Sequence, residues 1–375
     1  MKIMFSAGEA SGDLHGANLA RSLRELDPQI ELLGMGGKEM AAAGVDIVYD
    51  IKNLGVIGVG EIIRKIPFFF RLRDFLVDTM RKEKPDVLVC IDYPGFNMRL
   101  IKVAKAAGIP VVYYILPTIW AWHKSRGKTI AKYTDLAISL FPFEAKMYED
   151  MGTNVIYAGH PLVDTVHATM SRREACAHFG LDERKKTVLL MPGSRVQEVR
   201  GLLPCMLEAA KLIRKEAGDV QFILPKASTI DEGLLDEIIR ASGVAVTVGE
   251  EKVYDMMNLS TAAIAASLET ALMGLPTLLV YRVNRLTYWL SKVLVHIDSI
   301  GLPNIIMGHR VIPELWQDEV TPENIAAAMV PMITDKVHKS LAAVRRTMGE
   351  PGAVQRTAQA ILDFARERGA HEAIQ

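Results

Sequence analysis

Short apolar runs alternate with helical patterns along most of the chain, and this alternation narrows the possible folds more than any other feature. Strands that alternate with helices form parallel sheets built from right-handed βαβ units. A charged interval at 171–186 interrupts the alternation, which then restarts. The pattern therefore predicts an α/β fold with two Rossmann-like parallel-sheet domains facing a central cleft. The predicted strands are 2–6, 31–34, 86–91, 111–115, 135–140 and 154–157, followed by 187–191, 220–224, 245–248, 262–265 and 277–281.

The last part of the chain differs from the rest because it carries only helical patterns, from 321 to 374. Pro322 is a typical first residue of a helix, and Gly349 and Pro351 separate two later helices. With no strand pattern of its own, this tail is expected to pack on existing surfaces. We predict an N-terminal domain at 1–168, a C-terminal domain at 169–340, and C-terminal helices at 341–375 that pack back on the N-terminal domain.

Composition excludes several classes of protein. Across 375 residues the formal net charge is zero and 50% of residues are apolar, so the basic excess of a nucleic-acid-binding protein is absent. Three cysteines without a C-x-x-C pair indicate neither a disulfide framework nor a thiolate zinc site. The first strand follows Met1 directly, which indicates no signal peptide, and no apolar run reaches the ~18 residues of a spanning helix. We therefore expect a cytoplasmic protein that is soluble or peripherally bound to a membrane.

The loop after the first predicted strand carries three polar side chains, Glu9, Ser11 and Asp13. Open α/β sheets bind their ligands at the carboxyl ends of strands. Gly8 and Gly12 in the same loop let the backbone bend and let a ligand approach it closely. The loop is therefore predicted to line a ligand site. The alternative is that Ser11 or Asp13 caps the helix that follows.

Three further polar positions follow predicted strands of the first half. Asp92 ends the strand at 86–91, where its carboxylate is placed to accept a proton from a bound hydroxyl group, unless it caps the next helix or fixes the turn. Trp120 lies in an aromatic and basic loop that suits a sugar and a phosphate. His160 follows the strand at 154–157 and is either structural or borders the cleft.

The second half repeats this arrangement. Gly193, Ser194 and Arg195 follow the strand at 187–191 and precede a helical pattern. Backbone N–H groups at a helix start and a guanidinium together favour a phosphate. The alternative is that Ser194 is an ordinary cap beside a solvated arginine. Glu269 begins a short helix, where an acid can hold ribose hydroxyl groups.

The segment 55–73 departs from the alternation because it joins a glycine-rich apolar loop to Phe68, Phe69 and Phe70, flanked by basic residues. One interpretation is an interfacial segment, whose apolar side chains enter a bilayer while its basic side chains meet anionic headgroups. The alternative is a helix buried between the domains, with its basic side chains reaching solvent.

Taken in order, these motifs resemble the lipid-A-disaccharide synthase family of bacterial inverting glycosyltransferases of the GT-B type. The resemblance implies transfer of 2,3-diacylglucosamine from its UDP donor to 2,3-diacylglucosamine 1-phosphate (lipid X), which yields a β-1,6-linked disaccharide and UDP. The motifs that carry the resemblance are Ser6-Ala7-Gly8-Glu9-Ala10-Ser11-Gly12-Asp13, Ile91-Asp92-Tyr93-Pro94-Gly95-Phe96-Asn97, Pro117-Thr118-Ile119-Trp120-Ala121-Trp122, Phe141-Pro142-Phe143-Glu144, Gly159-His160-Pro161, Leu190-Met191-Pro192-Gly193-Ser194-Arg195, Glu269, Tyr281-Arg282 and Leu302-Pro303-Asn304.

The resemblance implies roles for individual residues. Inversion needs a base for the acceptor hydroxyl group, and Asp92 with Glu9 suits this role. It also needs stabilisation of the departing diphosphate, and Arg195 suits that role. The implied acceptor-side residues are Gly8, Ser11, Asn97, Trp120 and His160; the donor-side residues are Gly193, Ser194, Arg195, Ser267, Glu269 and Asn304; and the membrane or acyl contacts are Ile57, Ile62, Ile66, Phe68, Phe69 and Phe70.

The resemblance also implies the partners. They are UDP-2,3-diacylglucosamine, lipid X and the anionic surface of the inner membrane, with no nucleic acid, and a homodimer is left open. No Asp-x-Asp pair or histidine cluster indicates a metal site, so we expect neither a metal nor a cofactor.

One departure from the family pattern leaves alternatives open. The family carries a Ser-Gly-Thr-Ala-type loop before the acidic donor-site residue, whereas this chain has the shorter Ala265-Ala266-Ser267-Leu268-Glu269. A catalytically impaired homologue is therefore one alternative. A UDP-sugar 2-epimerase-like enzyme of the same fold is another, although a soluble sugar needs no apolar segment like 55–72. A dinucleotide-dependent oxidoreductase is disfavoured because no G-x-G-x-x-G follows the first strand of either half.

Overall fold

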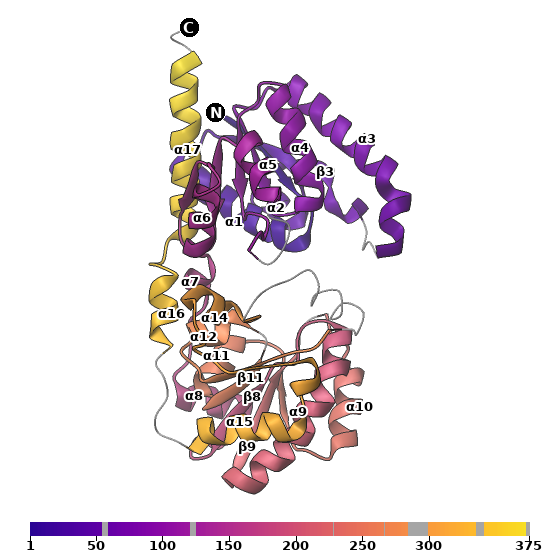
Figure 1. Cartoon of the computed structure of the whole chain (residues 1–375), viewed down its shortest axis with the longest axis vertical. Coiled ribbons are helices and arrows are strands. Elements are labelled where there is room, and N and C mark those ends of the chain that lie inside the picture. Colours follow the sequence, from indigo (N-terminus) through magenta and orange to yellow (C-terminus); the bar gives the residue numbers. More distant parts are fainter. Residues whose placement is uncertain are drawn as a thin grey trace. The chain divides into compact units, whose positions relative to one another are not determined.

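The computed structural model describes residues 1–54, 59–120, 125–227, 229–265, 267–283, 299–334 and 341–372. The chain forms two compact units (Figure 1). Unit 1 comprises Met1–Pro161 together with Glu350–Gln375, and unit 2 comprises Leu162–Gly349. The chain therefore leaves unit 1 once and returns to it near its C-terminus. The predicted boundaries after residues 168 and 340 stay a prediction.

Unit 1 is built on a seven-stranded sheet with the order β3-β2-β1-β4-β5-β6-β7, in which every described pairing is parallel. Side chains of β1 alternate between two core clusters, with Ile3 and Phe5 on one face and Met4 on the other, as the two-residue period of a strand requires. The strands are β1 (Lys2–Ala7), β2 (Glu31–Gly36), β3 (Asp46–Asp50), β4 (Val87–Ile91), β5 (Val111–Tyr114), β6 (Leu136–Ser139) and β7 (Val155–Tyr157).

Helices cover both faces of this sheet (Figure 1). One core cluster joins the sheet to α1 and α17, and the other joins it to α3, α4, α5 and α6. The two faces of the sheet are thus buried by different parts of the chain. The helices are α1 (Ala10–Leu26), α2 (Lys38–Ala42), α3 (Val59–Glu83), α4 (Pro94–Ala106), α5 (Ser125–Tyr133), α6 (Pro142–Glu149) and α17 (Ala353–Glu372), with a short 3₁₀ helix at Ile51–Leu54.

Unit 2 is built on a six-stranded parallel sheet with the order β10-β9-β8-β11-β12-β13. The two sheets confirm the predicted α/β class with paired parallel sheets. The strands β3 and β13 were not predicted. The strands of unit 2 are β8 (Lys186–Leu190), β9 (Val220–Pro225), β10 (Thr247–Gly249), β11 (Ala262–Ala265), β12 (Thr277–Tyr281) and β13 (Glu314–Trp316).

Helices α9 and α15 cover one face of the second sheet, while α8 and α11 cover the other. In α9, Val199, Leu203, Met206 and Ala210 are buried at helical spacing, so one stripe of the helix faces the core. The helices of unit 2 are α7 (Leu162–Thr165), α8 (Arg172–Phe179), α9 (Val196–Ala217), α10 (Glu232–Ser242), α11 (Val253–Leu259), α12 (Leu268–Leu272), α14 (Leu302–Met307), α15 (Pro322–Thr334) and α16 (Ala342–Thr347).

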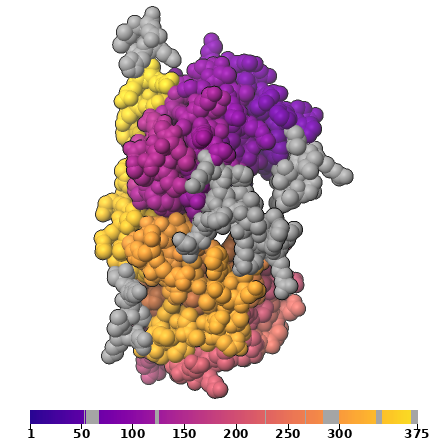
Figure 2. Space-filling view, viewed as in Figure 1, coloured from indigo at the N-terminus to yellow at the C-terminus, as the bar shows by residue number. Residues whose placement is uncertain are grey.

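The helical tail is divided between the units. Helix α15 packs in the core of unit 2, whereas α17 places Ala358, Ile361 and Leu362 in a core cluster of unit 1. Arg368 of α17 also forms an ion pair with buried Asp135 at 2.6 Å. Figure 2 shows α17, at the yellow end of the scale, lying against the indigo-to-magenta surface of unit 1. Within the described helices, none combines the length and apolarity needed to cross a bilayer.

Candidate functional site

In unit 1 the predicted site residues gather where β1 and β4 end. The two strands are neighbours, with Ala7 in register with Ile91, so Glu9 and Asp92 follow them at the same edge of the sheet. Asp92 and Tyr93 both adopt left-handed backbone conformations, with φ of 46° and 50°. Two consecutive non-glycine residues in this region are uncommon and strained, and such strain persists only where the surroundings impose it.

A buried hydrogen-bond network imposes this turn. The Asn97 Nδ2 amide donates to the carbonyl oxygens of Asp92 at 2.8 Å and Ser6 at 3.1 Å, and the Ser6 hydroxyl donates to Asn97 Oδ1 at 2.6 Å. The Tyr113 hydroxyl donates to the same Asp92 carbonyl at 2.9 Å. Asn97 is 0% exposed. In this structure the Asn97 amide fixes the backbone that carries Asp92, and the contact of Asn97 with a substrate stays a prediction.

The Asp92 carboxyl group is half-buried at this turn. Burial raises its pKa, the negative charge of Glu9 raises it further, and a hydrogen bond from the Tyr93 backbone N–H partly offsets both. A carboxylate with a raised pKa is a stronger base. Glu9, at the N-cap position of α1, is exposed and therefore acts on Asp92 through its charge.

Gly8 and Asp13 have structural reasons for their identities. A Cβ atom on Gly8 would lie 2.0 Å from the Tyr93 ring, so no larger residue fits there. The buried Asp13 carboxylate accepts hydrogen bonds from the backbone N–H groups of Gly37 at 2.7 Å and Met40 at 3.1 Å, which begin α2. Asp13 therefore caps α2, and the alternative that Asp13 or the exposed Ser11 caps α1 is wrong, because α1 already begins at Ala10 without a side-chain cap.

Trp120 and His160 belong to one aromatic cluster in unit 1. The Trp120 and Phe143 ring centroids are 6.1 Å apart, Phe143 stacks on Phe141 at 5.6 Å, and Phe141 lies 5.1 Å from His160. Burial, together with the neighbouring His15, lowers the pKa of His160 to about 4, so its ring is neutral near pH 7. Trp120 is half-buried, and His160 is buried.

Glu144, at the start of α6, is a site feature to which the sequence assigned no role. Its carboxyl group is buried and accepts a hydrogen bond from the Ser139 hydroxyl at 2.9 Å. Burial raises the pKa of Glu144 to about 7, and the hydrogen bond only partly offsets this. The Phe-Pro-Phe-Glu motif was the available signal, but it does not show that the glutamate points inward.

In unit 2 the start of α9 is organised by Glu198. Its carboxylate accepts hydrogen bonds from the backbone N–H groups of Ser194 at 3.1 Å and Arg195 at 3.2 Å, and from Arg195 Nη1 at 2.8 Å. The alternative in which Ser194 is an ordinary cap is therefore wrong, because Arg195 is the N-cap residue and the Glu198 side chain accepts from its backbone N–H group. Gly193 has φ of 119°, and a Cβ atom there would lie 2.3 Å from Glu198 Oε2. A phosphate bound to these donors must replace the Glu198 carboxylate.

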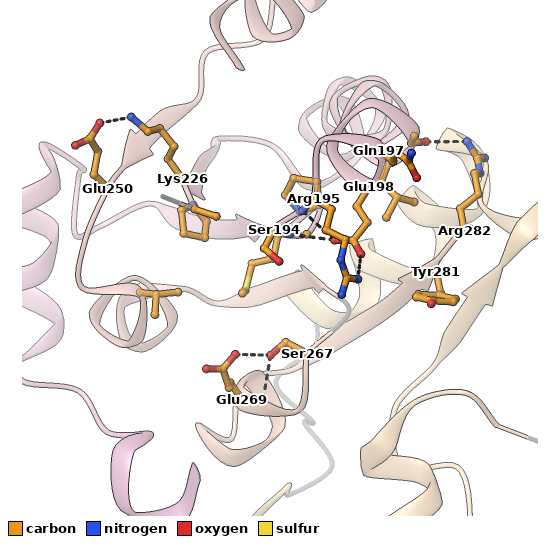
Figure 3. A pocket seen from close by; sticks show the side chains of 18 of the residues that line it. Ser194, Arg195, Gln197, Glu198, Lys226, Glu250, Ser267, Glu269, Tyr281 and Arg282 are labelled. Atoms are coloured by element: carbon orange, nitrogen blue, oxygen red, sulfur yellow. Dashed lines mark hydrogen bonds and ion pairs between the residues drawn. The ribbon is translucent and has the colours of Figure 1, made fainter. Parts of the chain in front are cut away.

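These residues line a cavity of about 1280 Å³ within unit 2 (Figure 3). Arg195 reaches into it with a side chain that is 81% exposed, and Lys226 is paired with Glu250 at 2.5 Å. Ligand pockets in proteins measure roughly 300–1,000 Å³, so this cavity is large enough for a nucleotide with a further group attached. Lining residues from the ends of five strands are Ser194 and Arg195 after β8, Lys226 after β9, Glu250 and Lys252 after β10, Ser267 and Glu269 after β11, and Tyr281 and Arg282 at and after β12.

Glu269 and Ser267 face one another in this cavity (Figure 3). The Ser267 hydroxyl donates to Glu269 Oε2 at 2.8 Å and accepts a hydrogen bond from the Glu269 backbone N–H at 3.1 Å, so Ser267 also caps α12. The hydroxyl group of Tyr254, on α11, donates to Glu269 Oε1 at 2.8 Å. The sequence offered no signal for Tyr254.

Asn304 is placed differently from its prediction. It is buried, and its Nδ2 amide donates to the Ile312 carbonyl at 2.9 Å and to Glu314 Oε1 at 2.5 Å. Its Oδ1 atom accepts hydrogen bonds from the backbone N–H groups of Val311 and Ile312. Asn304 is not among the residues that line the cavity, and its side chain fixes the corner before β13. Its contact with the donor stays a prediction.

The three consecutive phenylalanines of α3 do not share one environment. Phe68 and Phe69 are half-buried against the core of unit 1, and the Phe69 ring lies 6.2 Å from that of Phe96. Phe70 is 45% exposed, as is Phe75 five residues later. The Arg73 guanidinium lies 5.0 Å from the Phe70 ring centroid. The other predicted membrane contacts, Ile57 and the side chains of Ile62 and Ile66, lie outside the described residues.

Among the described residues, no group of three histidine, cysteine or acidic side chains is arranged to hold a metal ion. The two sites differ in their polar groups: unit 1 presents the Asp92 and Glu9 carboxyl groups, and unit 2 presents the cations Arg195 and Lys226 together with the Glu269 carboxylate.

Residues 3–362 match a family described as lipid-A-disaccharide synthetase. The chain is 43% identical over 372 residues to the lipid-A-disaccharide synthase of Geobacter metallireducens, and 37% identical over 372 residues to that of Myxococcus xanthus. Each match covers 97% of both chains.

Solved structures resemble the fold at low sequence identity. A putative UDP-N-acetylglucosamine 2-epimerase from Listeria monocytogenes matches with a TM-score of 0.65 and 14% identity, over 98% of this chain and 97% of that one. A glycosyltransferase from Rickettsia africae matches with a TM-score of 0.58 and 12% identity, over 98% and 97%. These likenesses show the fold alone, which is the GT-B type.

Proposed function

Because the chain belongs to the lipid-A-disaccharide synthase family, we propose that it is the hexosyltransferase that joins two diacylglucosamine units. It transfers 2,3-diacylglucosamine from its UDP donor to 2,3-diacylglucosamine 1-phosphate, and releases the β-1,6-linked disaccharide and UDP. The observation that carries the proposal is the family match over residues 3–362, which includes both strand-end sites.

In this reaction Asp92 is the general base. It takes the proton from the acceptor hydroxyl group while that oxygen attacks the anomeric carbon and the bond to the diphosphate breaks. Support comes from the raised pKa of Asp92 and from the network that fixes its backbone. Glu9 assists through its charge, which makes Asp92 more basic. Ser11, Trp120 and His160 remain proposed acceptor-side residues, and Gly8 shapes the same loop.

The UDP group binds in the cavity of unit 2. Arg195 and the N–H groups of Ser194 and Arg195 offset the negative charge that develops on the leaving diphosphate. The diphosphate takes the place of the Glu198 carboxylate, which already uses these three donors. Glu269, oriented by Ser267, accepts hydrogen bonds from the ribose.

We further propose that the exposed rings of Phe70, which the Arg73 guanidinium contacts, and of Phe75 meet the anionic surface of the inner membrane. Lipid substrates with acyl chains must be reached at a bilayer, and an apolar surface next to a cation suits its interface. The protein is then peripherally bound.

Light scattering on the purified chain decides between a monomer and the homodimer left open above.

The proposed reaction is tested by incubating the purified protein with both lipid substrates and measuring disaccharide and UDP together. Stoichiometric formation of the two products is expected. UDP binding without product formation would indicate the impaired homologue. Conversion of UDP-N-acetylglucosamine to its C2 epimer, with no transfer between the lipids, would instead support the epimerase alternative.

A further inference from the structure

Both carboxylate oxygens of Glu269 are held by hydroxyl groups. Tyr254 donates to Oε1 and Ser267 donates to Oε2, each at 2.8 Å. A carboxylate has about four lone-pair positions on its two oxygens. The two hydroxyl groups use two of these positions and restrict rotation of the carboxylate about its last bond.

Tyr254 is itself held firmly. It lies in the first turn of α11, which Lys252 begins in a left-handed conformation with φ of 60°. Buried Asp255, the next residue, accepts hydrogen bonds from the backbone N–H groups of Thr169 and Met170, both at 2.7 Å. The turn that carries the phenol is thus tied to the segment before α8.

The Tyr254 phenol stays protonated well above neutral pH. Burial raises the pKa of Tyr254 to about 12, and the charge of Glu269 contributes to the rise. A neutral hydroxyl group next to a carboxylate can only donate a hydrogen bond to it, so Tyr254 is always the donor in this contact.

We propose that Tyr254 is a positioning residue that holds the Glu269 carboxylate ready for the two adjacent hydroxyl groups of a ribose, and thereby makes the cavity select ribonucleotides over 2′-deoxyribonucleotides. The inference rests on the proposed binding of UDP in this cavity. A site built to accept a substrate hydroxyl group discriminates against the analogue that lacks it, because the site's polar group is then left unpaired. That discrimination requires the carboxylate to be oriented before binding.

The test compares the affinities of UDP and 2′-deoxy-UDP by calorimetry on the full-length protein. The parent should prefer UDP by roughly tenfold to a hundredfold, the worth of a hydrogen bond to a charged group. Tyr254→Phe should lower this ratio about tenfold by weakening UDP binding while leaving 2′-deoxy-UDP binding nearly unchanged. Tyr133→Phe, which removes the same group from α5 of unit 1, should leave the ratio as in the parent.

Each outcome separates the inference from the proposed function. No UDP binding by the parent would overturn the proposed function. UDP binding with an unchanged ratio in Tyr254→Phe would overturn the inference alone, and equal weakening of both nucleotides would show a merely structural role. If Tyr254→Phe does not fold, Glu269→Gln serves as the second variant, because it should also lower the ratio, and a ratio equal to the parent's would overturn the inference.

Discussion

The two strand-end sites are held in opposite ways. At the tip of β4, Asp92 is half-buried, its backbone is in a strained conformation, and the amide that fixes it is 0% exposed. At the start of α9, Arg195 is 81% exposed and is held by a single carboxylate. A proton transfer requires close placement of the base, whereas a diphosphate is attracted by charge over a longer range. The side chain that we propose as the base is thus fixed by its surroundings, whereas the side chain that we propose to meet the diphosphate is left open to solvent.

The comparison is tested most severely by Asp92→Asn. Turnover should fall by ~10²–10⁴-fold, the usual worth of a general base, because the amide keeps the shape but cannot take the proton. UDP affinity should stay within about twofold, since the substitution lies in unit 1. Turnover is measured with both lipid substrates, and Asp150→Asn, an exposed carboxylate of the same unit, is the control. Near-normal turnover would remove Asp92 from the mechanism.

A second test uses Glu144→Gln to ask whether the stability of unit 1 depends on pH through this buried carboxyl group. The pKa of Glu144 is raised to about 7 when folded, against an ordinary value near 4.5. A raised pKa in an acid means that the folded state holds its proton more tightly, so stability falls as pH rises from about 4.5 to about 7.

Glu144→Gln removes this loss, and the variant should be more stable than the parent at pH 8 by on the order of 3 kcal/mol. At pH 4 the two proteins should be alike, because both then carry a neutral group at this position. The neutral buried His160 also destabilises the fold at low pH, but equally in both. Melting curves at the two pH values provide the measurement, and an equal difference at both would contradict the assignment.

A third test addresses the open site through Arg195→Ala. Removing the guanidinium should weaken UDP binding by roughly tenfold to a hundredfold, as expected for one charged hydrogen bond. Binding of lipid X should not change. Calorimetry with UDP is the measurement, and Arg240→Ala, an exposed ion-paired arginine on α10, is the matched control. Unchanged UDP affinity would mean that Glu198, not the nucleotide, is the lasting partner of Arg195.

The smallest effect is expected at the surface of α3. Replacing exposed Phe70 and Phe75 by serine should reduce binding to anionic vesicles about tenfold, since a buried ring is worth ~1.5–3 kcal/mol and these rings are already partly covered. The melting temperature should change little. Replacing half-buried Phe68 and Phe69 by serine should instead lower the melting temperature and leave vesicle binding little changed. Co-sedimentation with vesicles and melting curves are measured for both pairs. If both pairs changed vesicle binding and melting temperature in the same way, α3 would have no distinct membrane-binding face.

Much of the fold could be predicted from periodicity, because a parallel strand buried on both faces is a continuous apolar run. The strand β3 was missed because its residues are mostly half-exposed at the sheet edge. The strand β13 was missed because its three residues begin with Glu314 and so form no apolar run. Asn97 and Asn304 were assigned to ligands because a polar residue after a strand looks the same in sequence whether it faces a substrate or its own backbone. The capping of α2 by Asp13 joins residues 24 positions apart, which no local pattern reports.

The return of α17 to unit 1 has a consequence for synthesis on the ribosome. Unit 2 is one uninterrupted stretch, Leu162–Gly349, so all its residues are synthesised before those of α17. The core cluster that contains Ala17 and Leu23 of α1 also contains Ile361 and Leu362. Ribosomes add about 5–20 residues per second, and domains usually fold in the order in which they emerge. Unit 1 departs from this order, because the core cluster on its α1 face can be completed only after the last helix of the chain has been made.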